Sequence, residues 1–242
     1  MFIQAVDIIP ENRTDEYTWQ IPAISSFSRM SLDKPITFFV GENGTGKSTL
    51  LEAIAVAYGF NPEGGSKNFA FSSVETHSSL WKSIRLIKGA KRPSDGFFLR
   101  AESFYNVASE IERLDGHTNS LFQSYGGKSL HQQSHGESFI ALALNRFRGN
   151  GLYILDEPEA ALSSSRQLAL LSIMHRLVQN GSQLIIATHS PMLLAYPDAR
   201  IFEFSDLPIG TILYEETEAY KITSSFIQNK DRFLQVLFSD DT

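Results

Sequence analysis

The feature that most constrains this chain is the segment Gly41-Glu-Asn-Gly-Thr-Gly-Lys-Ser48, which fits the spacing G-x-x-x-x-G-K-[ST] of a phosphate-binding loop. The apolar run Ile36–Val40 precedes it and is typical of a strand buried on both faces of a parallel sheet. Helical periodicity begins near Lys47. A glycine-rich turn that matches by chance would lack this strand and this helix. We therefore expect backbone N–H groups to surround the phosphates of a nucleotide, with Lys47 as a positive charge and the Ser48 hydroxyl as a ligand of Mg²⁺.

Composition sets the limits for the rest of the chain. Its 242 residues correspond to one large domain or two small ones, and 42% hydrophobic with 20% charged residues describe a folded protein. The sequence contains no cysteine, which excludes disulfides, thiol nucleophiles and cysteine-ligated metals. It has no apolar run of membrane-spanning length, and its first residues lack the basic segment of a signal peptide. We expect a cytoplasmic protein without membrane insertion.

Two carboxylates follow a second apolar run, in Leu152-Tyr-Ile-Leu-Asp156-Glu157. At the carboxyl end of a buried strand, Asp156 would hold Mg²⁺ through water, and Glu157 would accept a proton from the water that attacks the γ-phosphate. Taken alone, this pattern equally describes a strand that enters a polar loop. The preceding phosphate-binding loop favours the catalytic interpretation.

Two weaker motifs accompany these. His189 follows the apolar strand Gln183–Ala187, and such a strand end lies on the ligand-binding edge of an open α/β sheet. An ordinary loop histidine is the alternative. Ser134-His-Gly-Glu137 precedes a helix with apolar residues at helical spacing, where a serine and a helix N-terminus can bind an anion. A simple N-cap serine explains Ser134 equally well.

The order of the four motifs resembles that of ATP-binding-cassette (ABC) ATPases, namely Walker A, signature, Walker B and switch histidine. The chain is also similar to small stand-alone bacterial ATPases of the AAA family, and to SMC-type and RecF-type heads without their coiled coils. The resemblance covers nearly the whole chain. It implies an α/β fold of the P-loop NTPase class, an ABC-type head. Such a head has a mainly parallel sheet flanked by helices, N-terminal antiparallel strands and an inserted helical lobe.

The resemblance also implies site residues. Glu157 would be the general base, His189 the γ-phosphate sensor, and Ser48 and Asp156 the Mg²⁺ ligands. The signature turn would cap the ATP held by another copy in an ATP-dependent homodimer. The implied phosphate-binding residues are Asn43, Gly44, Thr45, Gly46, Lys47, Ser48 and Thr49, and the implied signature residues are Ser134, His135, Gly136 and Glu137.

Two positions depart from the family pattern. His135 stands where the signature has its first glycine, and Glu102 stands where a glutamine is usual. A carboxylate at residue 102 still has the chemistry to reach Mg²⁺ or its water, so we count Glu102 as a third candidate metal ligand. The residue that stacks on adenine is left open among Tyr17, Trp19 and Phe27.

We expect one ATPase domain over residues 1–242, in which 1–59 and 149–242 form the nucleotide-binding core and 60–148 a helical and signature lobe. Further expected elements are strands at Phe2–Ile9, Gly96–Phe104, Arg200–Phe204 and Thr211–Glu215, and helices at Val107–Leu114, Glu137–Arg148 and Ser163–Gln179, with one amphipathic helix at the C-terminus.

The formal net charge of −6 argues against a general nucleic-acid binder. Lys82–Arg92 is a local exception, with five basic residues and no acidic one. We interpret it as a helix with a solvated basic face, or else as a docking patch for an acidic partner.

Several other functions are disfavoured. A GTPase needs Asn-Lys-x-Asp, which Asn229–Arg232 does not complete. A nucleoside or nucleotide kinase shares the phosphate-binding loop but does not need Glu157, the Ser134 turn and His189 together. A zinc pair of His131 and His135 lacks a third ligand, and Gly136 is expected to interrupt a helix there. The favoured hypothesis is an ATP-driven switch that dimerises around two ATP-Mg²⁺ and regulates an unidentified protein or nucleic-acid partner. The alternative is the ATPase subunit of an ABC transporter.

Overall fold

The computed structural model describes residues 1–12, 17–65, 78–100 and 135–239. Its centre is a six-stranded sheet in the order β5-β6-β7-β3-β8-β9. Neighbouring strands are parallel except at the β8–β9 edge, which is antiparallel. The bounds are β3 Ile36–Val40, β5 Asp95–Arg100, β6 Gly151–Asp156, β7 Gln183–Ala187, β8 Arg200–Glu203 and β9 Gly210–Thr211.

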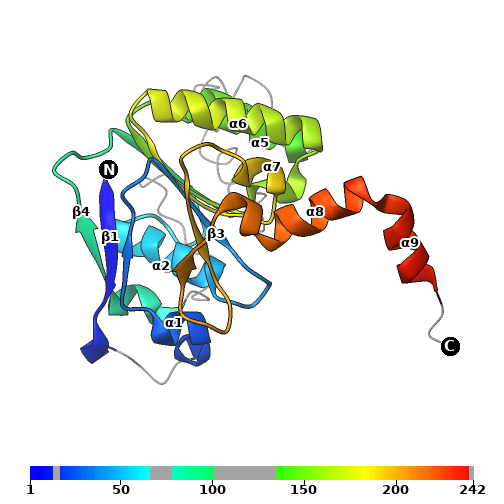
Figure 1. Cartoon of the computed structure of the whole chain (residues 1–242). Helices are drawn as coiled ribbons and strands as arrows, with labels where there is room; N and C mark the ends of the chain where they lie inside the picture. Colours follow the sequence, from blue (N-terminus) through cyan, green and yellow to red (C-terminus); the bar gives the residue numbers. More distant parts are fainter. Residues whose placement is uncertain (13–16, 66–77, 101–134, 240–242) are drawn as a thin grey trace.

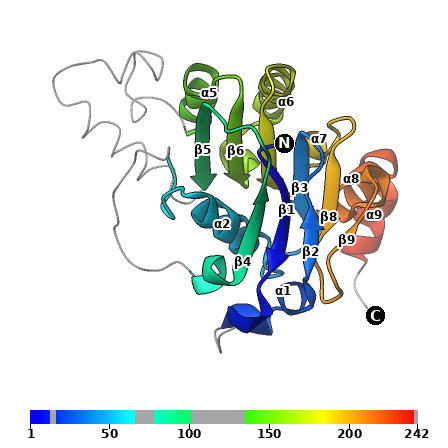
Figure 2. The same cartoon turned by 90° about the vertical axis from the view of Figure 1, so that its left-hand side faces the viewer.

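A second, antiparallel sheet covers one face of the first (Figure 2). Its order is β2-β1-β4, and the expected N-terminal strand is its central member. One hydrophobic core joins this sheet and two helices to the main sheet. The elements of this layer are β1 Ile3–Ile8, β2 Arg29–Ser31, β4 Ile84–Lys88, α1 Pro22–Ser26, α2 Lys47–Tyr58 and the 3-10 turns η1 Pro10–Asn12, η2 Tyr17–Gln20 and η3 Ser79–Ser83.

Three helices cover the opposite face of the main sheet, α5 His135–Arg146, α6 Ser164–Gln179 and α7 Pro191–Leu194. Successive residues of β3 show why a continuous apolar run was needed. Phe38 belongs to the core under these helices, and Phe39 belongs to the core around α2. Both side chains are fully buried. This confirms the predicted strand with two buried faces.

The basic helix predicted at Lys82–Arg92 is wrong. Residues 79–83 form a 3-10 turn, and residues 84–88 form strand β4, which pairs with β1. Ile84 lies in the core, whereas Arg85 forms an ion pair with Asp7 at 3.1 Å. Ile84 and Leu86 therefore face this core at the two-residue period of a strand, and pairing with β1 overrides the apparent helical spacing. The basic side chains remain exposed, and their acidic partner stays a prediction.

The C-terminal elements also differ from expectation. Strand β9 ends at Thr211, and Tyr214–Glu216 is the 3-10 turn η6 in place of the predicted strand. The tail contains two helices, α8 Glu218–Gln228 and α9 Lys230–Phe238, instead of one. They are separated by Asn229, whose φ of −131° is not helical. Figure 1 shows both helices extending away from the sheets.

Helix α5 begins at His135, so Gly136 lies inside the first turn and does not interrupt the helix as predicted. Residues 84–100 supply β4 and β5 to the two sheets, although they lie within the segment expected to form the lobe. The predicted helix Val107–Leu114 lies outside the described residues. None of the described helices is both long and apolar enough to cross a membrane.

Candidate nucleotide-binding site

The loop between β3 and α2 has the backbone that its glycines predict. Gly41 has φ +138° and Gly46 has φ +96°, values that L side chains rarely adopt. A Cβ atom on Gly41 would overlap the Phe204 carbonyl oxygen, and one on Gly46 would lie 3.0 Å from Ile24 Cδ1. The two glycines therefore let the loop pack closely against Phe204, which follows β8, and against Ile24 of α1.

Lys47 lies inside this loop and is only 4% exposed. Its Nζ donates hydrogen bonds to the carbonyl oxygens of Gly41, at 2.8 Å, and Glu42, at 2.7 Å. Burial lowers the pKa of Lys47, and the carboxylates of Glu157, Asp156 and Glu159 oppose that shift. Nucleotide binding would place an anionic phosphate beside this amine, where the two carbonyl oxygens now accept its hydrogen bonds.

Ser48 and Asp156 meet beside Lys47. The Ser48 hydroxyl donates a hydrogen bond to Asp156 Oδ1 at 2.9 Å, across 108 positions of sequence. A hydroxyl and a carboxylate in contact suit Mg²⁺, which usually takes one or two protein ligands and completes its shell with water and phosphate. The described residues contain no group of three His, Asp or Glu side chains that would form an all-protein metal cage. The pair therefore fits a cation that arrives together with a nucleotide.

Glu157 and His189 follow the neighbouring strands β6 and β7. His189 Nε2 lies 3.6 Å from Glu157 Oε1, and the two side chains are 43% and 40% exposed. Glu157 has φ +48°, which turns the chain at the strand end. Glu159 accepts a hydrogen bond from the His189 backbone N–H at 2.6 Å. The structure therefore brings both predicted residues together on the strand edge next to Lys47, in reach of solvent.

The start of α5 packs against the segment that follows Glu157. A Cβ atom on Gly136 would lie 2.5 Å from the Ala161 carbonyl oxygen, so this contact requires glycine. Glu137 forms an ion pair with Arg166 of the same chain at 2.8 Å. Ser134, Glu102 and His131 lie outside the described residues, and only the backbone of His135 is described.

The remaining loop residues and the aromatic candidates differ in how far they are exposed. Asn43 and Gly44 are exposed, and Thr45 donates from its hydroxyl to the Glu42 carbonyl at 2.8 Å. Phe27 is only 4% exposed in the core, which removes it as an adenine-stacking residue. Trp19 packs at the edge of that core, and Tyr17 is 63% exposed.

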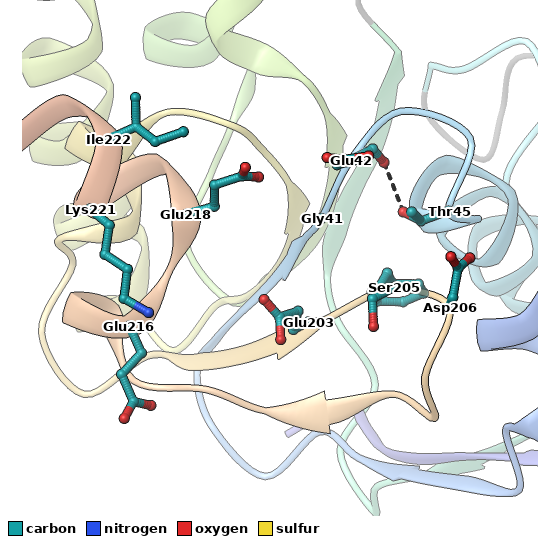
Figure 3. Close-up of a pocket in the computed structure, with 11 residues that line it drawn as sticks. Gly41, Glu42, Thr45, Glu203, Ser205, Asp206, Glu216, Glu218, Lys221 and Ile222 are labelled. Carbon is teal, nitrogen blue, oxygen red and sulfur yellow. Dashed lines mark hydrogen bonds between the residues drawn. The ribbon is translucent and has the colours of Figure 1, made fainter. Parts of the chain in front are cut away.

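Two features of the site escaped sequence reasoning. Arg100, at the end of β5, lies between Glu52 and Asp156. A cavity of about 600 Å³ also opens between the loop and α8 (Figure 3). Its acidic residues come from separate segments of the chain, so no local sequence pattern predicts the cavity. Their negative charge disfavours the binding of phosphate there. They are Glu42, Glu203, Asp206, Glu216 and Glu218, with Lys221 as the cation among them.

A parallel sheet that carries a glycine-rich loop, a buried lysine and a serine–aspartate pair at its carboxyl edge defines a P-loop nucleoside-triphosphatase. Residues 23–160, more than half of the chain, match the family described as "AAA domain". Residues 129–195 match a second AAA-domain family, whose description also mentions AbiEii toxin and a type IV toxin–antitoxin system. The chain thus belongs to the AAA-domain family, and it is a P-loop ATPase of the ABC type.

Individual relatives point the same way. The chain is 23% identical to the macrolide export ATP-binding/permease protein MacB of Campylobacter jejuni, over 82% of this chain and 33% of that protein. It is 26% identical to the vitamin B12 import ATP-binding protein BtuD of Salmonella heidelberg, over 64% of this chain and 66% of that protein. The chain thus spans about a third of the length of MacB.

Among solved structures, CbiO1 from Clostridium perfringens, described as part of the ABC transporter complex CbiONQ, shares the fold. Its TM-score is 0.53 at 15% identity, covering 98% of this chain and 99% of that one.

Proposed function

We propose that the chain hydrolyses ATP with Mg²⁺ at this site, and that two copies close around two nucleotides to act as a switch on a partner. The contact between Ser48 and Asp156 at 2.9 Å carries the proposal, because it joins the loop to the strand that bears Glu157. Mg²⁺ would be held by Ser48 and Asp156 and would supply charge neutralisation at the β- and γ-phosphates. Lys47 would exchange its two carbonyl partners for phosphate oxygens.

Glu157 is proposed as the general base. Its carboxylate is partly exposed beside Lys47, where a water molecule has access. His189, whose Nε2 lies 3.6 Å from Glu157 Oε1, is proposed to contact the γ-phosphate. Glu159 accepts a hydrogen bond from the His189 backbone N–H and so fixes the backbone position from which the imidazole extends.

The dimer is proposed because part of the phosphate-binding loop lies on the surface of a single copy, where a second copy could cover it. Asn43 and Gly44 are exposed, so the γ-phosphate of bound ATP would face outward. Helix α5 presents its N-terminus next to the Glu157 segment, and residues 134–137 are proposed to cap the nucleotide of the other copy. In a two-fold arrangement, both copies would give and receive this contact.

The partner is proposed to be a protein or a nucleic acid. The second candidate function, the ATPase subunit of an ABC transporter, is supported at least as well by the named relatives, since MacB and BtuD are named as export and import proteins. A pull-down from membrane and soluble fractions separates the two. Recovery of an integral membrane protein favours the transporter subunit.

Nucleotide-dependent mass tests the proposed switch. We expect the Glu157→Gln variant to double its mass in light scattering when ATP and Mg²⁺ are added, because hydrolysis no longer reopens the dimer. With ADP in place of ATP, the mass measured by light scattering should remain that of the monomer. An unchanged mass in apo, ADP and ATP conditions would contradict the proposed dimer.

A further inference from the structure

Arg100 connects two buried carboxylates next to the proposed metal site. Its Nη1 donates to Glu52 Oε2 at 2.6 Å, and its Nε lies 4.0 Å from Asp156 Oδ2. Glu52 is 8% exposed and Asp156 is 7% exposed. Glu52 follows Ser48 by one helical turn, so both lie on the face of α2 that meets the strand ends.

The geometry gives each oxygen of Asp156 a different neighbour. Oδ1 accepts from the Ser48 hydroxyl, and Oδ2 faces the guanidinium of Arg100. A guanidinium is planar and donates in several directions, so it can serve two carboxylates at once. Beside Asp156, such a cation would compete with Mg²⁺ for the carboxylate, and a second anion would weaken that competition. Glu52 is placed to be that anion.

We propose that Arg100 and Glu52 are positioning residues that orient Asp156 and set its affinity for Mg²⁺. Glu52 takes the shorter contact with Arg100 and so leaves the Asp156 carboxylate available to the metal. This inference rests on the proposed Mg²⁺-ATP site. It adds that the opposite charges of Arg100 and Glu52 change how much Mg²⁺ the site needs.

The two charges should act with opposite signs. Glu52→Gln removes one carboxylate partner of the guanidinium beside Asp156, and we expect the free Mg²⁺ concentration at half-saturation to rise about tenfold. Arg100→Gln removes the competing cation, and that concentration should fall. The double variant has the parental charge balance and should return to within about threefold of the parent. A merely structural role would shift all three variants the same way.

The test measures thermal unfolding of the full chain at fixed ATP over a range of Mg²⁺, with Glu157→Gln in every variant to prevent hydrolysis. Arg85→Gln is the matched control, because Arg85 also pairs with a buried aspartate, Asp7, on the other sheet. It should not move the Mg²⁺ midpoint. If Arg100→Gln does not fold, comparing Glu52→Gln with the double variant still shows whether removing the Arg100 charge lowers the Mg²⁺ midpoint, because these two variants differ only at residue 100.

The outcomes separate the two proposals. A parent that does not respond to Mg²⁺ overturns the metal site and this inference together. A parent that responds, with a double variant no better than Glu52→Gln, overturns the inference alone. A raised midpoint in Glu52→Gln that the second substitution restores supports it.

Discussion

At the scale of single residues, the phosphate-binding loop positions Lys47 where the phosphates of a nucleotide are proposed to bind. Lys47 is buried and bonded to two carbonyl oxygens, which hold the amine in place, and it forms no ion pair with the residues that the structure describes. Burial lowers its pKa accordingly. An anionic phosphate would favour the charged amine, so nucleotide binding and protonation of Lys47 should reinforce each other.

The sharpest test at this scale concerns Glu157. Replacing it by glutamine keeps the shape and removes the proton acceptor, so we expect turnover to fall by roughly 10²–10⁴-fold while ATP binding persists. Steady-state phosphate release and nucleotide binding are the two measurements. Glu215→Gln, an exposed change outside the site, is the control. Turnover near the parental rate in Glu157→Gln would assign the base elsewhere.

At the scale of elements, sequence patterns predicted the core strands but failed for β4, whose conformation depends on pairing with another strand. Strands β3, β6 and β7 were predictable because both of their faces are buried, which requires continuous apolar runs. Strand β4 was mistaken for a helix, because Leu80, Trp81, Ile84 and Ile87 also fit helical spacing. Only the pairing of β4 with β1, the N-terminal strand, distinguishes a strand from a helix here.

The site divides in the same way. The positions of Lys47, Ser48, Asp156, Glu157 and His189 in the fold were predictable, because each lies within two residues of the end of a recognisable strand or helix. Arg100 and Glu52 were not, since nothing in their local sequence indicates that β5 ends beside α2. Such contacts arise from strand order, which a single sequence does not encode locally.

The contact between α5 and the segment after Glu157 gives a prediction at this scale. Gly136→Ala places a methyl group 2.5 Å from the Ala161 carbonyl, so α5 must move. We expect a loss of about 1–3 kcal/mol in the free energy of unfolding, measured by denaturant titration. Gly210→Ala has open space and is the control. Equal stability of the two variants would show that α5 is not held this closely.

At the scale of the whole molecule, the sheet edge proposed to bind the nucleotide is partly exposed, and a pair of C-terminal helices extends away from the sheets (Figure 1). Large apolar residues on those helices are exposed, including Ile227 at 71% and Phe238 at 76%. The nucleotide edge is the surface that the proposed dimer would cover. Closing it would place residues 134–137 of one copy over the loop of the other.

Mixing two inactive variants tests the shared site most directly. Lys47→Ala removes the lysine from the loop, and Ser134→Arg blocks the proposed cap, so each variant alone should be inactive. A mixed dimer would pair the intact loop of one variant with the intact cap of the other. Random exchange makes about half of the dimers mixed, each with one complete site. We therefore predict recovery of about a quarter of parental ATPase activity, or less if both sites must act together. No recovery, with subunit exchange independently demonstrated, would contradict a site built from two copies.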